Sequence, residues 1–176
     1  MTEPSSPAFD AAAAFLALSR QKLQRELWLR IEAAVNRLSD EQVWWRPNLH
    51  CNSVGHLMLH LDGNLRQWIL SLLGGAPDGR NREQEFNPVE QPGGAELLQR
   101  LRATLEAVDR VLAQFPADQL GATYRHPILA SEVNAITAIY QVVEHFSMHL
   151  GQILYLTKEQ LDVDLGFFAG LAPKSK

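Results

Sequence analysis

Residues 131–158 read SEVNAITAIYQVVEHFSMHLGQILYLTK, and this stretch decides the fold class. Its spacing predicts one long helix with apolar residues on two sides, Ile136 and Tyr140 on one and Ala138 and Val142 on another. A helix that is apolar nearly all round is buried on more than one face. The stretch is therefore either the central helix of a bundle or a helix that also forms a subunit interface.

Three further stretches carry the apolar spacing of amphipathic helices, with leucines recurring at steps of three, four and seven. Capping residues mark helix starts, as at Asn52 or Ser53, and glycine or proline marks helix ends, as at Gly74 and Pro116. A capping box over 39–42 predicts a short extra helical turn. The long helices are predicted at about 9–38, 53–73 and 95–115, which together with 131–158 predicts an all-α four-helix bundle.

Two long connections separate these helices. Residues 76–92 carry prolines and glycine amid charged residues, so we expect a loop, and loops of this length are often functional. Residues 117–130 include His126, which we expect to be a loop residue, and this connection is expected to pair briefly as an extended segment.

Length and composition limit the organisation of the chain. A chain of 176 residues with 46% hydrophobic content suits one compact domain. We expect that domain over residues 9–170, between a flexible N-terminal tail over 1–8 and a C-terminal tail over 171–176.

Composition also excludes some function classes. The net charge of -4 and the absence of a clustered basic face argue against a nucleic-acid partner. The apolar stretches are broken before they reach the roughly 18 to 20 residues of a membrane span, so no membrane partner is expected. The single cysteine, Cys51, excludes an intramolecular disulfide framework and suits a cytoplasmic location.

Two pairs of histidines have the spacing of metal ligands on a helix. His145 and His149 are four residues apart, and so are His56 and His60. Residues at this spacing share one helix face, so two imidazoles can bind the same ion. Within the second pair, His60 lies at the edge of the apolar stripe, whereas His56 lies further toward solvent. A pair of buried, hydrogen-bonded histidines is an equally good interpretation of either pair taken alone.

Taken together, the two pairs say more than either does alone. His60, His145 and His149 can converge on one divalent metal ion and leave coordination positions open. Three protein ligands with an open position is typical of a catalytic zinc site. Imidazole also suits nickel, copper and iron, with zinc or nickel the first expectation. The glutamate of the zinc-protease motif is absent, so that chemistry is not implied.

Six other polar residues are candidate neighbours of this site. His56 is a fourth ligand or a substrate contact, although a partly exposed histidine near the pocket mouth is the favoured interpretation. Two amides lie near the ligands and either orient an imidazole or make ordinary interhelical hydrogen bonds. For residues of the first connection there are two interpretations. In one, they close over the metal, with arginine binding an anionic substrate and glutamate acting as a general base. In the other, which is favoured, they form a solvated loop held by ion pairs. The amides are Asn64 and Gln152, and the connection residues are Arg80, Arg82 and Glu85.

The histidine motifs also resemble those of the DinB-like superfamily. Residues 52–64 read NSVGHLMLHLDGN and residues 145–153 read HFSMHLGQI, and both are similar to motifs of this superfamily in the same order. Together with WWRPN at 44–48, they resemble a largely uncharacterised branch that is related to bacillithiol and mycothiol S-transferases. The similarity covers roughly residues 10–168.

The resemblance carries its own expectations. It places the metal ligands at His60, His145 and His149, and it implies an up-down-down-up bundle and commonly a homodimer. In the transferase branches the metal activates a low-molecular-weight thiol, so a small-molecule substrate of this kind is expected. No motif in the chain identifies the thiol.

Three functions are compatible with these observations. The first is a metal-dependent enzyme, of hydrolase or thiol transferase type, which uses the open position of a three-histidine site. The second is a non-catalytic binding or interaction bundle that a metal stabilises. The third is a sensor that binds a small ligand in the same cavity.

Overall fold

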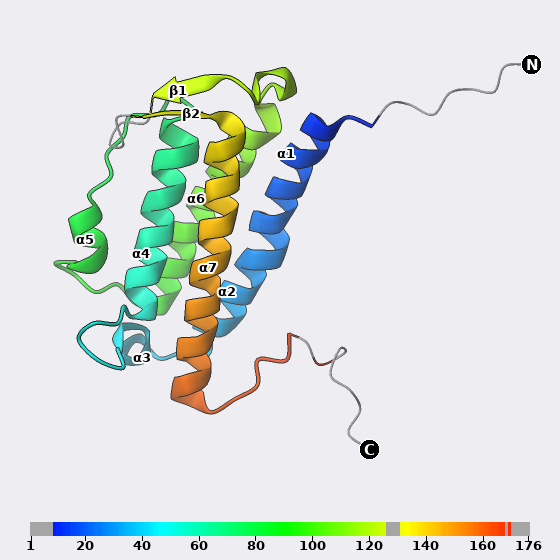
Figure 1. The fold of residues 1–176 in the computed structure, drawn as a ribbon. Coiled ribbons are helices and arrows are strands. Elements are labelled where there is room, and N and C mark those ends of the chain that lie inside the picture. The colour runs from blue at the N-terminus through cyan, green and yellow to red at the C-terminus, as the bar shows by residue number, and fades with distance from the viewer. Residues whose placement is uncertain (1–8, 126–130, 168, 170–176) are drawn as a thin grey trace, which may run out of the picture.

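The computed structural model describes residues 9–125, 131–167 and 169 of the chain. Four long helical columns pack into a bundle, which confirms the all-α class (Figure 1). The two predicted tails, over 1–8 and 171–176, lie outside the described residues, and so does His126. Within the described part, no helix is both long and apolar enough to cross a membrane.

The first column is continuous from residue 11 to residue 35. It consists of α1 (Ala11–Gln21), a π-helical segment (Lys22–Leu27) and α2 (Trp28–Val35). The Asp10 side chain caps it by accepting hydrogen bonds from two backbone N–H groups of the first turn, at 3.0 Å each. The short α3 (Asp40–Trp44) follows, with the predicted capping box.

The second column carries the first histidine pair. It consists of α4 (Val54–Leu65) and a second π-helical segment (Arg66–Ser71). Ser53 caps α4 as predicted, and its hydroxyl accepts a hydrogen bond from the backbone N–H of His56. The column ends at the predicted glycines, where Gly75 adopts a φ of +73° that other residues rarely take.

The third and fourth columns are α6 (Gly94–Gln114) and α7 (Ala135–Leu161). A 3₁₀ turn (Ala117–Gln119) and an antiparallel pair of strands, β1 (Thr123–Arg125) and β2 (Glu132–Asn134), lie between them. The prediction that the fourth helix begins near Ser131 is therefore wrong. Residues 132–134 pair with β1, and the helix begins only where the Asn134 side chain caps it, by accepting from Thr137 N–H at 2.8 Å.

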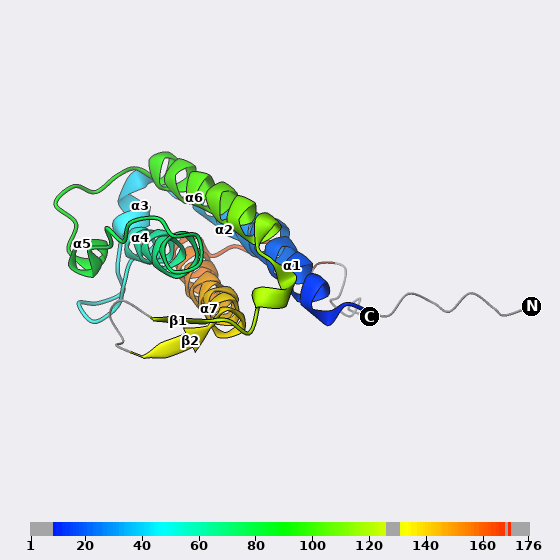
Figure 2. The ribbon, with the colours of Figure 1, turned by 90° about the horizontal axis from the view of Figure 1, so that it is seen from above.

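The first connection contains a helix that the sequence prediction missed. Helix α5 (Arg82–Phe86) is only five residues long, and the Asn81 side chain caps it. It packs against the outer side of α4 (Figures 1 and 2). This placement brings residues of the connection next to the histidine-bearing helix.

The four columns are arranged in a ring when the bundle is seen from its end (Figure 2). Column α1–α2 packs against α6 and α7, and α4 packs against the same two helices. Helix α4 therefore lies across the bundle from α1–α2, and α6 lies across from α7. Because α4 and α7 are direct neighbours, side chains from these two helices can meet.

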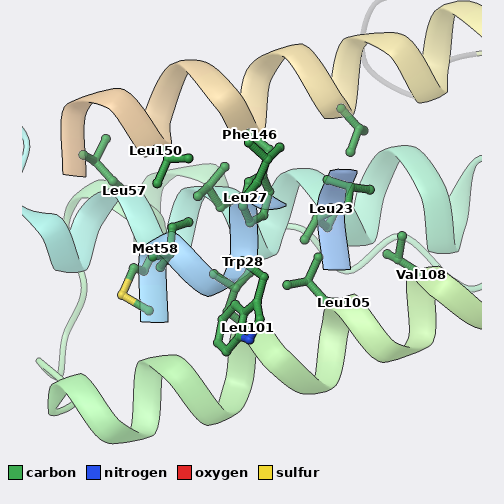
Figure 3. Packing of buried hydrophobic residues seen from close by; sticks show 14 of the residues in the cluster. Leu23, Leu27, Trp28, Leu57, Met58, Leu101, Leu105, Val108, Phe146 and Leu150 are labelled. Atoms are coloured by element: carbon green, nitrogen blue, oxygen red, sulfur yellow. The ribbon is translucent and has the colours of Figure 1, made fainter. Parts of the chain in front are cut away.

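All four columns contribute to one apolar core (Figure 3). Trp28 from the first column lies beside Leu101 of α6, Leu23 lies further along the same core, and Leu57 of α4 lies near Leu150 of α7 (Figure 3). These five side chains are at most 4% exposed. Burial of a large apolar side chain contributes on the order of 1.5–3 kcal/mol, so this core supplies the main stabilisation of the fold.

One face of α7 is not covered by any other part of the chain that the structure describes. Ile136, Tyr140, Met148 and Tyr155 are 45%, 64%, 48% and 66% exposed, respectively. The opposite face, with Ala138 and residues spaced along the same side, is buried. The sequence left two interpretations of this helix: the central helix of the bundle, or a helix that also forms a subunit interface. An exposed apolar face does not fit a central helix that is fully enclosed.

Candidate metal centre

Three histidines meet between α4 and α7. His60 comes from α4, and His145 and His149 come from successive turns of α7. The Nε2 atoms of His60 and His145 are 2.9 Å apart, and one possible ligand nitrogen from each of the three rings lies within 4.8 Å of the others. The structure thus brings the three predicted ligand residues together, from the two helices expected to carry them.

The rings face one another across a small space. The ring centroid of His60 lies 4.9 Å from that of His145 and 5.1 Å from that of His149, and the centroids of the two α7 rings are 4.4 Å apart. The His60 and His149 residues are 5% and 8% exposed, whereas His145 is half-buried. The group therefore lies at the edge of the core, with His145 as its most exposed member.

The second ring nitrogen of His60 has a fixed partner. Its Nδ1 lies 2.7 Å from Glu85 Oε2 and 3.2 Å from Arg80 Nη2. A guanidinium only donates and an ionised carboxylate only accepts, so the closer Glu85 contact indicates that Nδ1 carries the proton. In a neutral imidazole this leaves Nε2 as a lone pair that faces His145.

His149 has the same arrangement on α7. Its Nδ1 lies 2.7 Å from the amide oxygen Oε1 of Gln152, which only accepts, so Nδ1–H donates. Its Nε2 is buried and has no hydrogen-bond partner among the described residues. An unpartnered buried nitrogen is costly, because it loses its bond to water and gains none in exchange.

These donors fit a cation. Two imidazoles turn unprotonated Nε2 atoms toward the third ring, and unprotonated imidazole nitrogen is the form that binds metal ions. Without a cation, the close Nε2 atoms of His60 and His145 require a proton between them. The chemistry of the group, together with the unpartnered Nε2 of His149, therefore suits a divalent metal.

Burial and charge favour the neutral form of the two α7 imidazoles, His145 and His149. Burial, together with the nearby His149, His60, Arg80 and Arg82, lowers the pKa of His145 to about 4. Burial is also the main cause that lowers the pKa of His149, and the hydrogen bond that His149 donates to Gln152 only partly opposes it. Near pH 7 these two rings therefore do not need to lose a proton before they bind a metal.

Glu85 and Arg80 form a buried ion pair behind His60. Arg80 Nε donates to Glu85 Oε1 at 2.7 Å and Arg80 Nη2 donates to Oε2 at 2.9 Å, with side-chain exposures of 7% for both residues. Burial raises the pKa of Glu85, but the hydrogen bonds from His60 and Arg80 and the charge of Arg80 outweigh it and hold the pKa below its usual value. The expectation of a solvated loop is wrong for these two side chains, although the ion pair itself is present.

The remaining candidates take different positions. His56 is 6% exposed, so the expectation that it is partly exposed is wrong, although it does belong to the lining of a small cavity beside Phe86. Its Nδ1 accepts from the Ser53 backbone N–H at 3.1 Å as part of the helix cap, and burial lowers its pKa. Asn64 is buried on α4, one turn after His60. Arg82 is exposed, and its guanidinium lies 5.6 Å from the centre of the Phe86 ring.

The sequence profile of the DinB superfamily matches residues 23–153, which include all three histidines. The chain belongs to the DinB superfamily. A crystal structure described as a conserved protein of locus from Enterococcus faecalis has the same fold, with a TM-score of 0.65 and 19% sequence identity over 81% of this chain and 94% of that chain. No curated protein sequence is significantly similar to the chain.

In this DinB-superfamily chain, the structure adds residues that sequence reasoning missed. Phe86 packs against His60, with ring centroids 5.0 Å apart, and Gln67 accepts from Arg80 Nη1 at 3.0 Å. Gln141 lies one turn before His145, and its Oε1 is buried without a partner among the described residues. Only Gln141 had a usable signal, because it continues the four-residue spacing of the α7 histidines.

A cavity of this DinB-superfamily chain lies next to the Glu85–Arg80 pair and not over the histidines. It has a volume of about 710 Å³ and lies between the first connection and α4. Gly63, Arg80 and Glu85 belong to its lining, whereas the three histidines do not. The Glu85–Arg80 pair therefore lies between this cavity and His60.

Proposed function

We propose that this protein is a metal-dependent enzyme of hydrolase or thiol S-transferase type, with one divalent ion, zinc or nickel, held by His60, His145 and His149. The observation that carries the proposal is the convergence of three ring nitrogens within 4.8 Å, two of them left unprotonated by the partners of their Nδ1 atoms. In the part of the chain that is described, no fourth His, Cys, Asp or Glu joins the group. Three protein ligands leave room for an exchangeable fourth.

The chain and the ion would divide the chemistry between them. When bound, a divalent ion acts as a Lewis acid, which lowers the pKa of a water or thiol at its open position. The chain lowers the pKa of His145 and His149, and it orients His60 and His149 through Glu85 and Gln152. Because His60 and His149 are buried, bulk water has little access to the group from their side.

Two residues support a small polar substrate. Arg82 is exposed, and its charge reaches His145, as the lowered pKa of that histidine indicates. It is therefore placed to attract an anionic group on a thiol or an ester. The unpartnered Oε1 of Gln141, one turn from His145, offers an acceptor to a substrate donor or to a bound water.

Metal analysis of the purified protein tests the metal site. We expect about one equivalent of zinc or nickel in the wild type, in line with a single three-histidine site, and a loss of metal in His60→Ala and in His149→Ala. His56→Gln is the matched control, because it removes a buried histidine of the same helix while glutamine preserves the capping box. Full metal occupancy in both alanine variants would remove the proposal.

A turnover screen tests the enzymatic part. The metal-loaded protein is assayed with several low-molecular-weight thiols and an electrophile, and separately with simple esters and amides. We expect turnover in one series, and we expect it to be abolished by His149→Ala and retained by His56→Gln.

A second candidate function is a non-catalytic bundle or a ligand sensor that a metal stabilises. The position of the cavity between the first connection and α4 favours it, because that cavity lies behind Glu85 and not over the histidines. This function predicts that a chelator lowers the melting temperature while none of the substrate series is turned over. A ligand that raises the melting temperature without turnover would indicate the sensor.

We also propose a homodimer and the up-down-down-up helix order. The uncovered apolar face of α7 supports the dimer, because an exposed apolar patch on a helix is often an interaction site. The helix order is supported by Figure 1, where α4 and α6 both lead away from the end that holds α3.

A further inference from the structure

The first connection supplies a carboxylate to the back of a proposed metal ligand. Glu85 is 6% exposed, and its Oε2 lies 2.7 Å from Nδ1 of His60. It comes from α5, a five-residue helix outside the four columns of the bundle. A buried carboxylate in a segment of this kind requires compensating partners, because its desolvation alone is unfavourable.

The position of Glu85 determines which role it can have. It contacts Nδ1 of His60, whereas Nε2 of the same ring faces His145 at 2.9 Å. The two nitrogens lie on different sides of the imidazole, so the ring stands between Glu85 and the space enclosed by the three histidines. Glu85 is therefore poorly placed to take a proton from a substrate in that space, as a general base must.

A second layer of contacts holds the carboxylate in place. Arg80 binds both oxygens of Glu85, at 2.7 and 2.9 Å, and Gln67 accepts from the same guanidinium at 3.0 Å. Gln67 Nε2 in turn donates to Asp78 Oδ2 at 2.9 Å. Both Glu85 oxygens are thus fixed, which leaves the carboxylate little freedom to move away from His60.

Helix α4 also leaves space for this pair. At Gly63, an added Cβ would collide with Glu85 Oε1 and would lie 3.2 Å from Arg80 Nε. Only glycine at this position lets the carboxylate and the guanidinium approach the helix backbone so closely. Gly63 on α4 and Arg80 in the first connection therefore both support the contact between Glu85 and His60.

We propose that Glu85 is a positioning residue for His60, held by Arg80, and that it sets the strength of metal binding. By accepting the Nδ1 proton it fixes the tautomer and the ring orientation, so that Nε2 is directed toward His145 and His149 as a lone pair. This inference rests on the proposed metal site. Its consequence is that the first connection, which contributes no ligand, controls the affinity of the site.

Metal affinity of Glu85→Gln tests the inference. The amide keeps the size of the side chain but accepts more weakly, and its NH₂ group can face Nδ1, so the tautomer is no longer fixed. We expect Zn²⁺ affinity, measured by competition with a chromophoric chelator, to fall by about 10- to 100-fold, as is typical for partners of metal-bound histidine. The absorption spectrum of the Co²⁺-loaded protein is expected to change, because it reports the ligand geometry.

Matched controls separate positioning from folding. Glu83→Gln makes the same change on the exposed side of α5 and is expected to keep wild-type affinity and spectrum. Gly63→Ala displaces the ion pair while every ligand and Glu85 itself remain, and it is expected to weaken Zn²⁺ binding as well. Its control is Gly151→Ala on α7, where an added Cβ meets nothing within 4 Å.

The possible outcomes are distinguishable. Wild-type affinity and an unchanged Co²⁺ spectrum in folded Glu85→Gln would overturn the inference and leave the metal site intact. If Glu85→Gln does not fold, Gly63→Ala decides the question by the same two measurements. Absence of Zn²⁺ and Co²⁺ binding in the wild type would instead overturn the proposed function itself.

Discussion

Two histidines of the candidate metal centre, His60 and His149, make a hydrogen bond through Nδ1, and this bond determines the state of their Nε2 atoms. Glu85 fixes His60 and Gln152 fixes His149, and both partners accept, so both rings carry their proton away from the shared space. The i, i+4 spacing on α7 predicts which residues meet. The proton positions, in contrast, follow from partners that the spacing does not reveal.

The stability of the metal-free protein is expected to depend on pH through His145. Its pKa is about 4 in the folded chain and close to its ordinary value of 6.5 in the unfolded chain. Between these values the unfolded state binds more protons, so the free energy of unfolding falls as the pH is lowered from about 6.5 toward 4. The lowered pKa of His149 acts in the same direction.

Urea unfolding of the chelator-treated protein at a series of pH values checks this expectation. The unfolding midpoint should decrease as the pH is lowered through the window. His145→Gln should show a shallower dependence, because the histidine with the lowered pKa is gone. Some dependence should remain, because carboxylates and the other histidines still titrate. An identical dependence in wild type and variant would show that His145 does not have a lowered pKa in the folded state.

At the scale of elements, α4 is held to α6 by one buried acid. Asp62 is 1% exposed, and its Oδ1 accepts from the hydroxyl of Thr104 on α6 at 2.5 Å. Its Oδ2 accepts from Arg100 Nε at 2.8 Å and from Arg66 Nε at 3.0 Å. The two arginines are about half exposed and can be hydrated without the acid, whereas Thr104 is 1% exposed and cannot.

Asp62→Ala is therefore expected to lower the free energy of unfolding by about 1–3 kcal/mol, mainly because it leaves a buried hydroxyl without a partner. The measurement is urea unfolding at pH 7. In the Asp62→Ala, Thr104→Val double variant the loss should be smaller than the sum of the two single losses. Additive losses would mean that the Thr104–Asp62 hydrogen bond contributes little.

The predictability of each element depended on whether its signal was local. The long helices and their caps could be read from apolar spacing and from Ser53, because both act within a few turns. The start of α7 was misplaced, because pairing with β1 keeps Glu132–Asn134 extended. Helix α5 was missed, because five residues carry too little periodicity to be recognised.

The site was predictable to the same extent. His60, His145 and His149 were found from their positions on helix faces, and packing of α4 against α7 then brings them together. The position of Glu85 behind His60 depends on the path of the first connection, which no spacing rule describes. The burial of His56 was missed for a similar reason, since Trp44, from a separate short helix, packs edge-on against its ring at 5.3 Å.

At the scale of the whole molecule, the uncovered face of α7 is the feature that the single chain leaves unexplained. We expect the protein to be a dimer in sedimentation experiments, and Tyr140→Glu to shift it toward the monomer by burying a charge in the interface. Val89→Glu is the matched control, because Val89 is 91% exposed on the first connection. A monomeric wild type at high concentration, or a Tyr140→Glu variant that stays dimeric, would contradict this expectation.

The ring order of the four columns has a consequence for how the chain folds. The first column lies across the bundle from α4, the next along the chain, and α6 lies likewise across from α7. Among the described residues of the four columns, α4 and α6 are the one consecutive pair that packs extensively, and the whole first connection separates them. No early two-helix hairpin with a short loop is therefore available, and loop-closure entropy must be overcome before most native contacts form. We infer that the helices acquire protection from hydrogen exchange together rather than in successive pairs.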